Sequence, residues 1–145
     1  MSKIDELPGV ELDIAVARAL GWKPAIIGWE KNGYWNDEEK PWYISDDRDP
    51  VYIGNRLATF SPHSNIAQAF ELDGPLWIWS FREDHYGNIR VSVEITRVSN
   101  CYAYREYLAE IYVERNRKSK VETYATARCL AWLKAMAAKE GDNNV

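Results

Sequence analysis

Cysteine and histidine are scarce in this chain, which has two of each among 145 residues. Neither Cys101 nor Cys129 belongs to a C-x-x-C pair or stands near a histidine at metal-ligand spacing. The sequence therefore excludes a disulfide framework and predicts two reduced thiols. His63 and His85 form no cluster of zinc ligands. We expect no bound metal and no cofactor, because no motif for either occurs.

Long hydrophobic runs and an excess of positive charge are also missing. No apolar stretch approaches the ~18 residues that a membrane span needs, and the N-terminus MSKIDELPG lacks the apolar core of a signal peptide. We therefore expect no membrane association and a place in the cytoplasm. The chain has 18 Lys and Arg against 22 Asp and Glu, for a net charge of −4. This balance argues against general nucleic-acid binding, which needs clustered positive charge.

Aromatic residues are the abundant class, with seven Trp and nine Tyr. Large aromatic side chains either fill cores or form binding surfaces. Trp29, Trp35 and Trp42 lie among Gly, Asn, Pro and acidic residues, which are poor core material. The sequence predicts an aromatic-rich loop insertion at about 22–50, with a hairpin turn at Asn32–Gly33. These three tryptophans are candidates for ligand stacking or for a subunit interface.

Helical periodicity marks both ends of the chain. Near the N-terminus an apolar stripe precedes Gly21, and Glu11 and Asp13 stand in the first turn, where the helix dipole favours negative charge. The final stretch ETYATARCLAWLKAMAAK predicts a second amphipathic helix that ends at Gly141. A short helix is expected from Ile66 to about residue 72.

Strict alternation between these helices predicts strands. Residues 76–81 and 89–98 form a hairpin around a turn at 84–87, and 108–115 favours a strand over a helix. The first of these strands is apolar on both faces, so we expect it inside the sheet. The prediction is one α+β domain over 1–145, an antiparallel sheet packed by the N- and C-terminal helices.

The stretches ELDIAVARALGW, FSPHSNIAQAFEL and ETYATARCLAWLKA follow one another in this order and together span nearly the whole chain. As an ordered set they resemble the phage ABA sandwich domain family. Asn65 and Phe70 stand where the family has aspartate and tryptophan. The resemblance implies a phage or prophage origin and a helix–sheet–helix sandwich. It implies no particular reaction.

The cluster His63-Ser64-Asn65 contains residue types used in catalysis, but no nucleophile elbow surrounds it. We interpret Ser64 or Asn65 as a helix N-cap, in a capping box with Gln68. The amides of a capped helix can also bind an anion. Arg128 interrupts the small-residue face of the last helix, so it either pairs with Glu94 or Glu110 or holds an anionic ligand.

No acid, base, nucleophile or metal set emerges, which favours a non-enzymatic binding module over an enzyme. We expect a small phage accessory protein that binds a host protein or sequesters a small anionic ligand such as a nucleotide signal. The candidate ligand-binding residues are Ser64, Asn65, Arg128, Trp29, Trp35 and Trp42. Two alternatives stay open: an enzyme with its site at the aromatic loop and Arg128, and a purely structural homo-oligomer.

Overall fold

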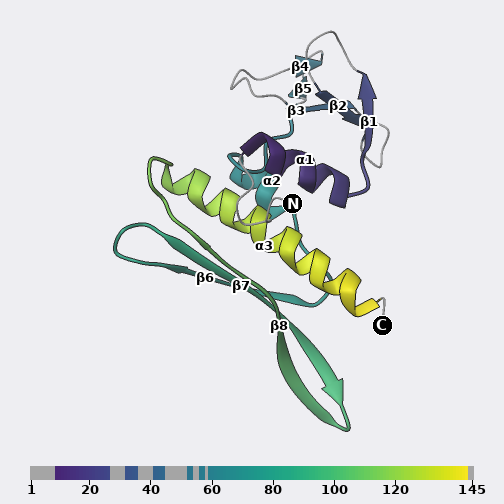
Figure 1. The fold of residues 1–145 in the computed structure, drawn as a ribbon, viewed down its shortest axis with the longest axis vertical. Helices are drawn as coiled ribbons and strands as arrows, with labels where there is room; N and C mark the ends of the chain where they lie inside the picture. Colours follow the sequence, from purple (N-terminus) through teal and green to yellow (C-terminus); the bar gives the residue numbers. More distant parts are fainter. Residues whose placement is uncertain are drawn as a thin grey trace.

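The computed structural model describes residues 9–26, 32–35, 41–44, 52–53, 56–57 and 59–143. Three helices and eight strands lie in these ranges (Figure 1). In chain order they are α1 (Gly9–Ala19), β1 (Lys23–Ile26), β2 (Asn32–Trp35), β3 (Pro41–Ile44), β4 (Tyr52–Ile53), β5 (Arg56–Leu57), α2 (Ile66–Phe70), β6 (Trp77–Glu83), β7 (Ile89–Ser99), β8 (Tyr102–Val113) and α3 (Lys120–Asn143).

The main sheet is antiparallel, with strand order β6-β7-β8. Trp79 lies opposite Val93 and Phe81 opposite Val91, which confirms the predicted hairpin and its alternation. Asp84–Gly87 makes the turn, because the Gly87 amide donates to the Asp84 carbonyl at 3.2 Å. The expectation that the first strand lies inside the sheet is wrong: β6 is an edge strand, and β7 is central.

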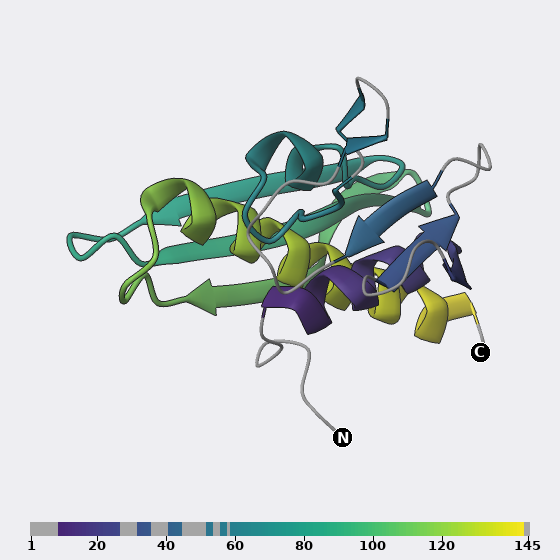
Figure 2. The ribbon, with the colours of Figure 1, turned by 90° about the horizontal axis from the view of Figure 1, so that it is seen from above.

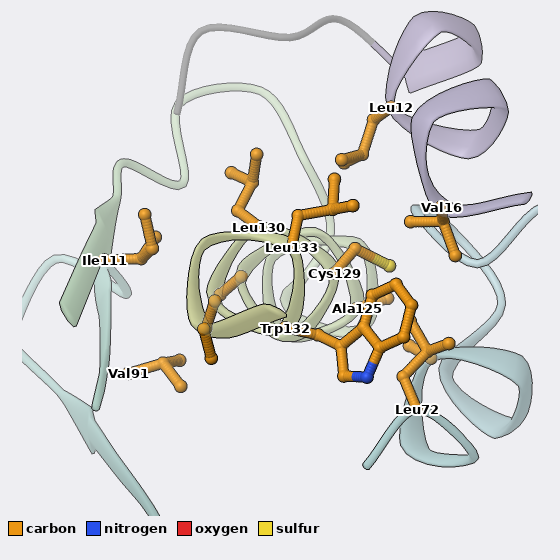
Figure 3. Packing of buried hydrophobic residues seen from close by; sticks show 14 of the residues in the cluster. Leu12, Val16, Leu72, Val91, Ile111, Ala125, Cys129, Leu130, Trp132 and Leu133 are labelled. Carbon is orange, nitrogen blue, oxygen red and sulfur yellow. The ribbon is translucent and has the colours of Figure 1, made fainter. Parts of the chain in front are cut away.

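Helix α3 forms the middle layer of the domain. It packs on β7 and β8 with one side and on α1 and α2 with the other (Figures 1 and 2). Its buried residues therefore run almost without interruption from Thr123 to Leu133. In Figure 3, Val91 and Ile111 of the sheet lie on one side of α3, and Leu12 and Val16 of α1 on the other.

The predicted α+β fold, an antiparallel sheet packed by helices, is confirmed. The predicted order of the layers, with the sheet between the two terminal helices, is wrong: α1 lies on α3 and not on the main sheet. This order explains the small side chains on α1 and α3. Ala17 and Ala131 are fully buried, and short side chains allow two helices to approach closely.

The segment predicted as a long loop contains a second sheet, with strand order β1-β2-β3. The turn predicted at Asn32–Gly33 is wrong: both residues lie within the central strand β2, between β1 and β3. Pairing on both sides outweighs the local turn preference, and the next residue, Tyr34, is only 5% exposed in the core.

Two further boundaries differ from the sequence prediction. α3 continues through Gly141 to Asn143, since one glycine costs a helix only about 1 kcal/mol. β8 begins at Tyr102, six residues before the predicted start at 108. The strand interpretation of this segment is confirmed, and the extension lengthens the β7–β8 hairpin well beyond the end of β6 (Figure 1).

Candidate functional site

The N-cap interpretation of Asn65 is confirmed. Its side-chain oxygen accepts a hydrogen bond from the Gln68 amide at 3.2 Å, which satisfies one of the first amides of α2. The reciprocal half of the predicted capping box is not made, because the Gln68 side chain accepts from the Ser61 amide at 2.7 Å. Ser64 contacts Ser61 through its hydroxyl, at 2.7 Å between the two oxygens.

His63 pairs with the buried Asp13, a contact that the sequence analysis did not predict. Asp13 Oδ2 lies 2.6 Å from Nδ1 of His63, and Asp13 Oδ1 accepts the His63 amide at 3.0 Å. Asp13 is 1% exposed, and its pairing with His63 is a role that its predicted place in the first turn of the helix did not indicate. Desolvation raises the pKa of this carboxyl, and the bonds from His63 oppose the rise.

The residues Asp13, His63 and Ser61 do not form a catalytic triad. Ser61 Oγ lies 3.4 Å from Nδ1 of His63, the same ring nitrogen that contacts Asp13. A triad instead places the hydroxyl on the second ring nitrogen, so that it can transfer its proton. Thr126 also donates to the His63 carbonyl at 2.9 Å. These contacts join α1, the segment before α2 and α3, which is a structural role.

Arg128 is only 5% exposed. Its Nε and Nη2 donate to the Leu72 carbonyl at 3.2 and 2.7 Å. The guanidinium carbon lies 3.6 Å from the ring centroid of Trp79 and 4.6 Å from that of Phe70, so two aromatic faces contact the cation. Phe70 is 44% exposed and forms the outer wall of this cage.

The charge of Arg128 has no close counter-charge among the described residues, where no carboxylate lies within 4.0 Å of it. The pairing predicted with Glu94 or Glu110 is wrong, since those residues contact Arg105 and Arg90. Burial lowers the pKa of Arg128, and the more distant Asp73 opposes that shift. Arg128 therefore remains a candidate for an anion, although Asn65 lies at the opposite end of α2.

The structure does not bring the three candidate tryptophans together in one described site. Trp29 lies outside the described residues, and only the backbone of Trp35 is described, within β2. Trp42 is half-buried and packs with Trp22 and Phe60, at centroid distances of 6.0 and 6.2 Å. This cluster joins β3 to the end of α1 and supports the small sheet.

Four well-exposed tyrosines lie on β8, a strand that the sequence analysis did not select as a candidate site. Tyr102, Tyr104, Tyr107 and Tyr112 are 76%, 48%, 68% and 49% exposed. β6 pairs with β7 only as far as Ile95, so the distal hairpin, residues 96–105, has two strands. Asn100 and Cys101 make its turn with positive φ angles of 49° and 71°. The recurrence of Tyr in YAYREY was the available signal.

Charged pairs accompany Tyr107 and Tyr112 on the face of the main sheet away from α3. Arg90 contacts Glu110 at 3.2 Å, and Arg105 contacts Glu94 at 3.8 Å. Lys134 of α3 donates to the main-chain carbonyl of Glu110 at 3.3 Å. No strand of the described residues pairs with the outer edge of β8, so the main-chain groups that alternate residues direct to this edge have no strand partner there.

The described residues contain no group of three or more His, Cys, Asp or Glu side chains that could hold a metal ion. None of the helices in those ranges is long and apolar enough to cross a membrane. Cys129 is buried in the core, where burial raises the pKa of its thiol, and Cys101 is exposed.

No family model matches this chain, and no curated protein matches it either.

Proposed function

We propose that this protein is a non-enzymatic binding module, of phage or prophage origin, that acts in the cytoplasm of the host cell. Its binding site is the outer edge of β8, which takes up an extended strand of another polypeptide. The observation that supports this role is the set of four tyrosines, each 48–76% exposed, on this one strand. Tyrosine and arginine are enriched at protein interfaces, and tyrosine provides contact area at a low entropic cost.

The backbone of β8 supports the same mode of binding. An extended peptide gains affinity by adding a strand to an exposed sheet edge, and side chains on both faces of that edge provide specificity. Tyr107 and Tyr112 flank the edge on the face away from α3, and Tyr102 and Tyr104 flank it on the other face. The strand is 12 residues long, well above the common length of about 5–6 residues.

A comparison of two tyrosine variants tests this proposal. Tyr104→Ser/Tyr107→Ser removes two rings from β8, and Tyr86→Ser removes a ring that is 83% exposed in the β6–β7 turn. Partners retained from a host lysate are identified by mass spectrometry, purified and titrated by calorimetry. The β8 variant should bind at least about tenfold more weakly, and the turn variant should equal the wild type.

Hydrogen exchange locates the contact independently of affinity. The purified partner should slow exchange at the edge amides of β8 and leave those of the β6–β7 turn unchanged. Equal affinities for the wild type and the β8 variant, or protection confined to other elements, would remove β8 as the binding site.

A second candidate function is the binding of a small anionic ligand at Arg128. An arginine residue that is only 5% exposed is uncommon without a paired anion, and the nearest described carboxylates lie beyond 4.0 Å. Nη1 of Arg128 also has no hydrogen-bond partner in the described part of the chain. The Phe70 ring, whose centroid lies 4.6 Å from the guanidinium carbon, is the exposed side from which a carboxylate or phosphate would approach Arg128.

The test uses the wild-type protein, since a buried substitution can unfold it. Inorganic phosphate, acetate and adenosine monophosphate are titrated up to millimolar concentration while the Arg128 Nε resonance is followed by NMR. A saturable shift of this resonance by one of the three anions is expected, with no shift of Arg90 as the exposed control. No shift of Arg128 with any of them refutes this candidate.

A further inference from the structure

The outer edge of β8 is self-complementary in charge. An extra residue, Leu108, interrupts the pairing of β8 with β7, because Val93 lies opposite Ala109 and Glu94 opposite Tyr107. This bulge places Arg105 and Glu110 on the same face, opposite the alternate β7 residues Thr96 and Ser92. Residues five positions apart in a regular strand would lie on opposite faces.

Two copies of β8 can therefore pair antiparallel about a two-fold axis. If the strands overlap along their full length, Tyr102 lies opposite the partner's Val113, and Arg105 lies opposite the partner's Glu110. Two-fold symmetry makes each of these contacts twice. Opposite charges in directly opposed positions stabilise antiparallel strands, whereas like charges destabilise them.

The same register matches the apolar residues on the other face. Ile111 and Val113 are buried there beneath α3, and Tyr104 and Tyr102 lie farther along that face, where they are 48% and 76% exposed. Full overlap places Tyr104 beside the partner's Ile111 and Tyr102 beside the partner's Val113. Aromatic and β-branched residues are favourable cross-strand neighbours. The tyrosines that are exposed in one copy would thus adjoin the core of the other.

We propose that the polypeptide bound along β8 is β8 of a second copy of this chain, so that the protein forms a two-fold symmetric homodimer with one continuous six-stranded sheet. This proposal rests on the strand-binding role proposed above for β8. The Lys134 contact with the Glu110 carbonyl covers one acceptor of the edge, and it gives way when the strands pair. Lys134 is exposed, so its ammonium group returns to water.

Charge reversal tests the register directly. Native mass spectrometry and sedimentation velocity should show the wild type at twice the 16.8 kDa mass of the chain at micromolar concentration. Arg105→Glu places two carboxylates opposite each other at both symmetric positions, and Glu110→Arg does the same with two cations. Each single variant should raise the dimer dissociation constant by about tenfold or more.

Two rescues separate the interface from the stability of the single chain. The double variant R105E/E110R restores opposite charges across the axis and should recover the dimer. Within one copy it still has two like-charge contacts, because the carboxylate introduced at position 105 faces Glu94 and the guanidinium introduced at position 110 faces Arg90. An equimolar mixture of R105E and E110R should also form a heterodimer of intermediate mass. In this heterodimer, the carboxylate introduced at position 105 of the first variant faces the guanidinium introduced at position 110 of the second. The native Glu110 of the first variant faces the native Arg105 of the second.

Each outcome bears on one proposal or the other. A wild type that stays monomeric at all concentrations overturns the homodimer, as does a dimer that the single reversals leave unchanged. In both cases the strand-binding role of β8 is still judged by the tyrosine variants and a purified host partner. A dimer that passes both rescues but binds no host protein supports the homodimer and confines the function of β8 to self-association.

Discussion

Removal of the Asp13 carboxylate should be among the most destabilising single changes in this protein. Asp13 is 1% exposed and accepts two hydrogen bonds from His63, one from the amide at 3.0 Å and one from the ring at 2.6 Å. In Asp13→Ala the His63 amide loses its acceptor, and α1 loses its polar link to the segment before α2.

The size of the effect follows from these contacts. A hydrogen bond to a charged group contributes about 1.5–3 kcal/mol, and breaking a buried pair costs about 3–5 kcal/mol. The His63 side chain is 27% exposed, so it is partly hydrated after the substitution. The loss of stability is therefore smaller than the sum of the upper values for two such hydrogen bonds. We expect Asp13→Ala to lower the free energy of unfolding by about 3–4 kcal/mol.

Denaturant unfolding followed by tryptophan fluorescence measures this change. Glu11→Ala is the matched control, because Glu11 lies on the same helix but is exposed, and it should change stability by less than about 1 kcal/mol. A double-mutant cycle with His63→Ala isolates the pair. A loss below about 1 kcal/mol for Asp13→Ala, or additive effects in the cycle, would refute the structural role assigned to this contact.

Three other changes have defined outcomes. Burial raises the pKa of Asp13 above its value in the unfolded chain, so the stability that Asp13 contributes falls as the pH rises above about 4. The free energy of unfolding of the wild type relative to Asp13→Asn, measured with denaturant, should therefore increase as the pH is lowered from 7 toward 4. Asn65→Ala removes the cap of α2 and should cost about 1 kcal/mol in the same assay, with no change in dimer mass; an unchanged stability would refute the cap. Lys134→Ala uncovers the Glu110 carbonyl and should lower the dimer dissociation constant in sedimentation equilibrium; weaker dimerisation would contradict the assignment of Lys134 to the edge.

Period-two alternation and helix punctuation predicted the parts of the fold that depend on local sequence. The β6–β7 hairpin, the strand character of β8, the α3 helix and the Asn65 cap were all accessible in this way. Each of these features depends mainly on residues that are close to one another in the sequence. The order of the layers was not accessible, because the small side chains of α1 and α3, such as Ala17 and Ala131, fit against a helix as well as against a sheet.

The missed features depend on residues that are distant in sequence. Asp13 and His63 are 50 positions apart, and nothing near Asp13 distinguishes a buried carboxylate from a solvated one. Gly33 carries a strong turn preference that two neighbouring strands override. Leu108 is a bulged residue, and alternation alone assigns Arg105 and Glu110 to opposite faces. The charge complementarity of β8 becomes visible only after this register shift is known.

The length of the β7–β8 hairpin connects the fold to the proposed assembly. Beyond Ile95 it has two strands, and an isolated two-stranded hairpin is marginally stable in water. Helix α3 of the same copy does not cover this distal hairpin, since Tyr102 and Tyr104 stay 76% and 48% exposed on the α3 side. A second β8 would give each distal hairpin a third strand and place these rings beside buried aliphatic residues of the other copy. The order of the hairpin and the formation of the dimer would then depend on the same contacts, and a change that weakens one weakens the other.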